Sequence, residues 1–107
     1  MFGEERSIRI AGNTENPCLL ALQAKGYALT LWFNKSVNGE YQQNFDAEKD
    51  GRHFSATTAT ELLGLVAMWE VRGDEWQTRQ SEPYVYHILD KTSVTYDSEG
   101  NVIEDDP

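Results

Sequence analysis

One segment constrains the fold of this chain more than any other: residues 58–76, which read TATELLGLVAMWEVRGDEW. Thr58 and Glu61 have the spacing of a capping box, in which the hydroxyl accepts from the Glu61 amide and the Glu61 carboxylate reaches back. Arg72 followed by Gly73 is typical of a helix C-terminus, because a cation suits the last turn and glycine adopts a left-handed cap. The segment therefore predicts a helix that begins after Thr58 and ends at Gly73.

This helix carries a broad apolar stripe. Large apolar side chains recur on it at helical spacing, at Leu62, Leu65, Val66 and Trp69. Such a stripe needs another element to cover it, so we expect these side chains to pack against a sheet. We also expect Gly64 to let a neighbouring backbone approach closely. The pattern indicates which residues form a core, but it does not indicate an activity.

The order of the predicted elements indicates an α+β fold. Before the helix at Thr58 we expect a strand over 7–11, a helix that opens at Asn16-Pro17 and ends at Gly26, and strands over 27–33, 41–47 and 52–56. The strand over 27–33 is apolar on both faces, so it is either central or covered on its second face by Trp32. The predicted core is β-α-β-β-β-α, with two helices on one face of a mostly antiparallel four-stranded sheet.

The sequence after Trp76 predicts a short, irregular C-terminal extension. Residues 81–90 suit a helix, and apolar residues at 94–96 and 102–103 flank a turn, which predicts either a small hairpin or a ragged tail. The length of 107 residues fits one domain over 1–107, with its core at about 7–90 and the acidic tail or hairpin over 91–107. Cys18 is the single cysteine, and no apolar run resembles a signal peptide or a membrane span. These features predict a cytoplasmic protein.

The charge of the chain is strongly acidic and uneven. The formal net charge is −9, and residues 83–107 carry six acids against one base. Phosphate backbones are bound mainly by lysine and arginine, so the charge argues against nucleic acid as a partner. An acidic surface attracts a basic protein, although it also serves simply to keep a protein in solution.

Two resemblances bear on the central part of the chain. Helix, three strands and helix is also the element order of double-stranded-RNA-binding domains, but those domains place lysines at the start of the second helix, where this chain reads TTATE over 57–61. We therefore reject RNA binding. The runs NPCLLAL, KGY, AEKDGR, ELLGL and MWEVRGDEW, within residues 16–76, resemble small acidic bacterial proteins of unknown function. That resemblance implies a bacterial, single-domain protein and lends it no activity or cofactor.

Catalytic and metal-binding patterns are weak. Cys18 near a helix N-terminus and either His53 or His87 would make a nucleophile and a base, but the leucines around Cys18 favour a packing role. Residues 46–51 begin like a calcium loop, yet Thr57 stands where the bidentate glutamate belongs. We expect no enzymatic activity, no metal and no cofactor.

The remaining candidate is a partner-binding site at the end of the long helix. Glu70 and Asp74 are like charges four residues apart, which oppose the helix dipole unless an arginine such as Arg72 or Arg79 compensates them. With Glu75 and Trp76 they have the composition of an interface. The sequence predicts a protein-binding module for a basic partner, of the inhibitor or immunity type. Two alternatives are a ligand-binding or enzymatic domain with an aromatic-lined pocket between helix and sheet, and a homodimer.

Overall fold

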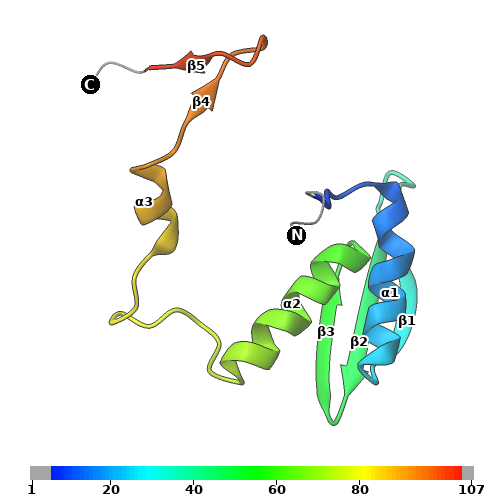
Figure 1. Ribbon diagram of the computed structural model, residues 1–107. Coiled ribbons are helices and arrows are strands. Elements are labelled where there is room, and N and C mark those ends of the chain that lie inside the picture. Colours follow the sequence, from blue (N-terminus) through cyan, green and yellow to red (C-terminus); the bar gives the residue numbers. More distant parts are fainter. Residues whose placement is uncertain (1–5, 105–107) are drawn as a thin grey trace. The chain divides into compact units, whose positions relative to one another are not determined.

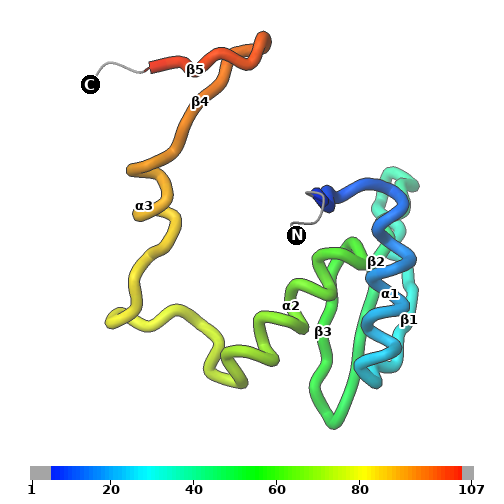
Figure 2. The backbone as a smooth tube through the Cα atoms, viewed as in Figure 1, coloured from blue at the N-terminus to red at the C-terminus, as the bar shows by residue number. Residues whose placement is uncertain are grey.

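The computed structural model describes residues 6–104, and the chain divides into two compact units (Figures 1 and 2). One unit ends at Trp76 and the other begins at Gln77. The first holds a 3-10 turn η1 (Gly12–Thr14), helices α1 (Glu15–Ala24) and α2 (Ala59–Arg72), and strands β1 (Ala28–Lys35), β2 (Tyr41–Lys49) and β3 (Arg52–Ala56). The second holds helix α3 (Val85–Asp90) and strands β4 (Thr95–Tyr96) and β5 (Val102–Ile103). The expectation of one domain over 1–107 stays a prediction.

The α+β class is confirmed, but the four-stranded sheet is wrong. The first unit has a three-stranded antiparallel sheet in the order β1-β2-β3, and β4 and β5 form a separate two-stranded sheet. The missing strand is the one expected over 7–11, which forms no regular structure. Ile8 is 93% exposed and Ile10 is also exposed, so two isolated apolar residues did not bury enough surface to pair as a strand.

Both long helices cover one face of the sheet. Helices α1 and α2 pack on each other and on the strands, as Figure 1 shows. The core lies between these layers, where Leu22 of α1, Leu62 and Val66 of α2, and Ala47 of β2 are fully buried. Directly opposed residues of antiparallel strands share a face, so the face of Ala47 also carries Leu29, Phe45, Phe54 and Ala56.

Helix α2 has the predicted ends but a narrower apolar stripe. The Thr58 hydroxyl accepts from the Glu61 amide at 3.1 Å, and Gly73 ends the helix at φ +80°. Leu65 is 37% exposed, so its expected burial is wrong; it lies a quarter-turn from Val66 and outside the surface that meets the sheet. Within the described structure a Cβ added at Gly64 would meet no atom within 4 Å, so no backbone approaches there.

Helix α1 begins one residue before the predicted Asn16-Pro17 start and has a second role. Its first residue, Glu15, accepts from the Ala59 amide at 2.8 Å through Oε1 and from the Thr60 hydroxyl at 3.1 Å through Oε2. Free amides at a helix N-terminus need acceptors, and a carboxylate there also complements the helix dipole. The first turn of α1 therefore caps the first turn of α2.

The strand predicted over 27–33 lies at an edge of the sheet. Among the described strands β1 pairs with β2 alone, and β2 is the central strand. Trp32 lies on the face that the helices leave open, where its indole N–H donates to Asp46 Oδ1 at 2.9 Å. The tight turn between β2 and β3 is formed by Asp50 and Gly51, both at positive φ, as a two-residue hairpin requires.

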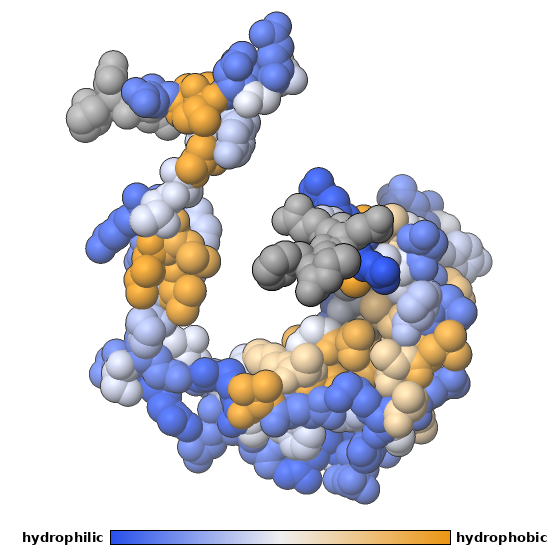
Figure 3. Space-filling view, in the orientation of Figure 1, coloured by the Kyte–Doolittle hydropathy of each residue, from blue (hydrophilic) through white to orange (hydrophobic). Residues whose placement is uncertain are grey.

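The second unit is built from local structure. Its helix is shorter than the predicted 81–90, and β4 and β5 pair as a small hairpin; residues 105–107 of the extension predicted over 91–107 lie outside the described residues. Asp97 organises the hairpin turn, because its Oδ1 accepts from the Glu99 and Asn101 amides, each at 2.9 Å. No side chain of α3, β4 or β5 is buried, and Figure 3 shows apolar surface over these elements. None of the helices in residues 6–104 combines the length and the apolar character that spanning a bilayer requires.

Candidate functional site

Glu70 lies near the C-terminal end of α2 and joins this helix to the end of α1. Its Oε1 accepts from Lys25 Nζ at 2.6 Å, and its Oε2 accepts from the Tyr27 hydroxyl at 3.4 Å. The ammonium group of Lys25 holds the pKa of the Glu70 carboxyl below its usual value, and the carboxylate raises the pKa of Lys25 in return. Glu70 is therefore a charged carboxylate whose charge is compensated within the chain.

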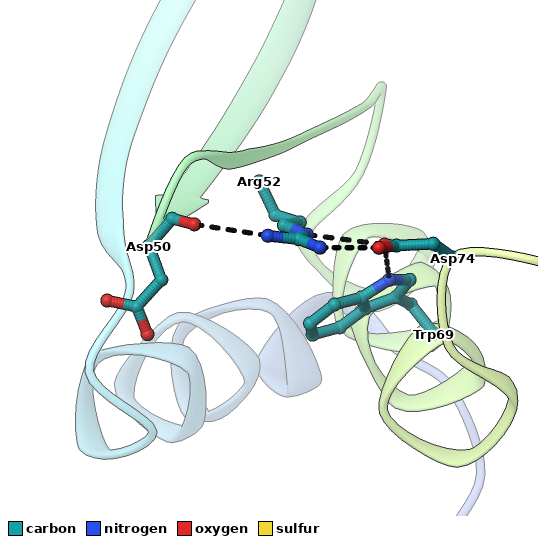
Figure 4. A network of polar contacts seen from close by, with 4 residues as sticks. All are labelled: Asp50, Arg52, Trp69 and Asp74. Atoms are coloured by element: carbon teal, nitrogen blue, oxygen red, sulfur yellow. Dashed lines mark hydrogen bonds and ion pairs between the residues drawn. The ribbon is translucent and has the colours of Figure 1, made fainter.

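Asp74 has a corresponding partner on β3 (Figure 4). The Arg52 guanidinium donates to it twice, from Nε at 3.2 Å and from Nη2, and the Trp69 indole N–H donates to its Oδ1 at 2.8 Å. The same guanidinium lies 5.6 Å from the centre of the Trp69 ring. The donation from Arg52, followed by that from Trp69, lowers the pKa of Asp74. This network fixes the residue after Gly73 to the start of β3.

Three aromatic rings lie beneath these ion pairs. Phe54 contacts Tyr27 and Trp69 edge-on, with centroids 6.0 and 5.6 Å apart. Edge-to-face packing is favourable because the positive edge of one ring meets the negative face of the other. Trp69 therefore belongs with the apolar layer between α2 and β3, and the ion pairs cover the end of that layer.

The predicted site residues thus fall into two groups. Glu70 and Asp74 are compensated by Lys25 and Arg52, not by the arginines named from the sequence. Glu75 and Trp76 lie at the end of the first unit, and Trp76 is 44% exposed. The Arg72 guanidinium donates to the Trp76 carbonyl at 2.7 Å, which holds the chain close to the helix end.

Sequence reasoning missed the two cations because they are distant along the chain. Lys25 lies 45 residues from Glu70, and Arg52 lies 22 residues from Asp74. One signal was available. Lys25 precedes the glycine that ends α1, and Arg52 follows the tight Asp50-Gly51 turn, so both mark ends of elements that a compact sandwich brings to one edge.

A second polar cluster lies on the open face of the sheet and was also missed. Asp46 accepts from the Ser55 hydroxyl at 2.6 Å and from the Trp32 indole at 2.9 Å, and His53 Nε2 lies 2.9 Å from its Oδ2. These contacts, with Ser55 the largest contributor, lower the pKa of Asp46. The Ser55 hydroxyl donates to the Asp46 carboxylate and not to His53. Ser55 and His53 therefore do not form a nucleophile–base pair.

Each of the remaining chemical candidates has contacts within its own unit. Cys18 is half-buried, with its Sγ 3.7 Å from Thr60 Oγ1, and His53 contacts Asp46. In the second unit the His87 ring lies at a tilt against the Tyr84 ring, with the centroids 4.6 Å apart. Within residues 6–104 no three histidine, cysteine or acidic side chains are grouped as a metal site would require. An open hollow of about 550 Å³ is lined by Ser7, Ile8, Arg9, Asn13, Thr14, Pro17, Cys18 and Leu63, and no aromatic side chain lines it.

Comparison with known proteins adds no assignment. No protein-family model matches the chain, and no match was found among curated proteins or solved structures. The function must therefore be inferred from the residues themselves. The informative distinction is between charged and aromatic side chains that have partners inside the fold and those that are exposed to solvent.

Proposed function

We propose that this protein is a non-enzymatic binding module for a basic protein, of the inhibitor or immunity type. The observation that carries the proposal is the composition of the second unit. Residues 77–107 carry seven acids and two bases, and the apolar side chains of their helix and strands are exposed. Acidic charge interspersed with exposed aromatic and aliphatic side chains suits a segment that buries its apolar surface on a partner.

The exposed apolar side chains of this unit are numerous for its size. Those more than half exposed are Tyr84, Val85, Tyr86, Ile88, Leu89, Val94, Tyr96 and Val102. Aromatic residues dominate binding hot spots because they bury a large area at low entropic cost. The surrounding acids would steer a basic partner toward this surface and discriminate against acidic ones.

The end of α2 supports the same role at the border of the first unit. We propose that Glu70, Asp74, Glu75 and Trp76 contribute to binding in two ways. Glu70 and Asp74 hold the end of the helix rigid through Lys25 and Arg52, and the exposed Trp76 is the aromatic anchor beside Glu75. An anchor held by paired neighbours loses less conformational entropy when it binds.

The test measures association with a basic partner captured on the immobilised chain. The association rate should fall steeply as salt is added, because exposed charges are screened beyond about 8–10 Å at physiological ionic strength. The variant Asp90→Asn/Glu99→Gln should slow association, whereas Glu40→Gln/Glu48→Gln, which removes two exposed charges from the first unit, should do so less. A rate independent of salt, or an equal loss in both variants, would contradict the proposal.

A further inference from the structure

Strand β1 is an unusual edge strand. It reads ALTLWFNK, with no acid and no proline, and it pairs with β2 over eight residues without a bulge. Leu31 and Phe33 are 51% and 55% exposed, and Trp32 between them is exposed as well. Proteins commonly protect sheet edges with charges, prolines, bulges or short strands. Apart from Lys35 at its end, β1 has none of these devices.

The backbone groups of β1 that face outward can be identified from the hairpin. The Ser36 amide donates to the Glu40 carbonyl at 2.7 Å, so this pair bonds across the strands. Hydrogen-bonded and non-bonded pairs alternate in an antiparallel ladder. The even-numbered residues of β1 therefore bond to β2, and the N–H and C=O groups of Leu29, Leu31 and Phe33 point to the free edge.

The opposite edge of the sheet differs. Strand β3 has five residues, and it begins with Arg52, which binds Asp74, and His53, which binds Asp46. Charge and shortness protect this edge against strand addition. Of the strands described in the first unit, only β1 offers a long row of backbone donors and acceptors without an acid.

We propose that β1 pairs antiparallel with β1 of a second copy of this chain, about a two-fold axis at Leu31. In this register Leu31 lies opposite its equivalent, and Leu29 lies opposite Phe33 of the second copy. All three belong to the helix-covered face, so apolar side chains meet apolar side chains. A register shifted to Trp32 would instead place Leu29 opposite Lys35. The two sheets join into one continuous sheet, and the outward groups of odd-numbered residues pair with one another.

The choice of a second copy follows from self-complementarity and charge. The same residues supply both sides of the ladder, as a two-fold interface requires. Each copy has a net charge of −9, so the copies repel at long range, but β1 itself carries no acid to be brought together at the contact. Screening by salt should therefore strengthen this association. This proposal is independent of the proposed function, because salt should weaken binding to a basic partner.

The test is sedimentation equilibrium of the full chain over a concentration series at two salt concentrations. The unaltered chain should form dimers, more strongly at the higher salt. Leu31→Lys places two ammonium groups at the axis and should weaken dimerisation by about tenfold or more. Val37→Lys makes the same charge change at an exposed hairpin residue outside the strand, so it should leave the dimer intact. Phe33→Lys is the second edge variant if Leu31→Lys impairs folding.

Cross-linking tests the register. Cα atoms of a hydrogen-bonded antiparallel pair are about 5.5 Å apart, within the range that a disulfide spans. In a Cys18→Ser background, Leu31→Cys should give a disulfide-linked dimer on mild oxidation, and Val37→Cys should give far less at the same protein concentration. A chain that remains monomeric up to millimolar concentration, or that binds another protein's extended segment at β1 while monomeric, would overturn the proposal.

Discussion

The two units of this protein use similar sequence signals to different ends. In the first unit, a capped helix, alternating strands and a tight turn bury Leu22, Leu62 and Val66 completely. In the second unit, α3 and the β4–β5 hairpin satisfy their backbone groups locally, yet none of their side chains is buried. Local hydrogen bonds are therefore enough to form helices and strands in both units. A core of fully buried side chains is a separate property, which the described elements of the first unit have and those of the second do not.

The use of acidic side chains follows the same division. In the first unit, acidic side chains accept hydrogen bonds from donors on other elements of that unit: backbone amides, hydroxyls, an indole or cationic groups. These acids are Glu15, Asp46, Glu70 and Asp74. In the second unit, Asp97 accepts from the amides of its own turn. Long-range polar contacts thus accompany the core, and local ones accompany the hairpin.

The largest expected contrast concerns apolar side chains. Leu62→Ala should lower the free energy of unfolding by about 2–5 kcal/mol, because it leaves a cavity in the fully buried layer. The matched change Leu89→Ala in the exposed helix α3 should change it by no more than about 0.5 kcal/mol. Urea titration followed by tryptophan fluorescence measures both. Equal losses would show that the side chains of α3 also belong to a core.

The next contrast concerns the long-range cap. Glu15→Gln keeps the shape of the side chain but removes the negative charge from the group that accepts from the Ala59 amide. It should therefore lower the free energy of unfolding by about 1–2 kcal/mol. Glu48→Gln, an exposed residue on β2, is the control and should change stability little. Circular dichroism during thermal unfolding compares them. Similar melting temperatures would show that the cap contributes nothing.

A smaller effect should appear on acidification. The pKa of Glu15 is lowered chiefly by the Ala59 amide, and that of Asp46 chiefly by the Ser55 hydroxyl. Their stabilisation is therefore complete above their unfolded pKa values, near 4, and is lost as the pH falls through the lower folded values. In the Asp46→Asn variant, the loss of unfolding free energy between pH 7 and pH 3 should be smaller by about 1 kcal/mol. Denaturant unfolding at pH 7 and pH 3 measures the slope, and an unchanged slope in the variant would exclude this role of Asp46.

The smallest global effect is expected at the hairpin turn. Asp97→Ala removes the acceptor of the Glu99 and Asn101 amides, so β4 and β5 should separate. The cooperative unfolding midpoint of the first unit should not move. NMR contacts between Thr95 and Ile103 report the local change. A shift in the midpoint would indicate that the hairpin stabilises the first unit, and it would contradict the division between the two units.

The parts of the fold that the sequence predicted well are those fixed by neighbours along the chain. Thr58 and Gly73 delimit α2 because caps act over three or four residues, and the strand over 52–56 has the predicted bounds. Leu65 shows the limit of this reasoning. Its spacing suits a broad stripe, but the width of the buried stripe depends on how the helix sits on the sheet.

The candidate site was less predictable than the fold. The like charges of Glu70 and Asp74 were visible in the sequence, but their cations lie on other elements, so no local pattern pairs them with Lys25 or Arg52. The strand expected over 7–11 failed for a related reason, because alternation alone does not provide a neighbouring strand. Whether Glu75 and Trp76 bind a partner stays a prediction.

The contact between Glu15 and Ala59 has a consequence for the order of folding. It joins the first turns of two helices across 44 residues, so it closes a loop that contains the entire three-stranded sheet. Closing so long a loop before the hairpins form would cost much chain entropy with few contacts in return. The contact should therefore form after the transition state, and loss of the Glu15 carboxylate should accelerate unfolding while leaving the refolding rate nearly unchanged. Glu15 would then lengthen the lifetime of the folded state by slowing its unfolding.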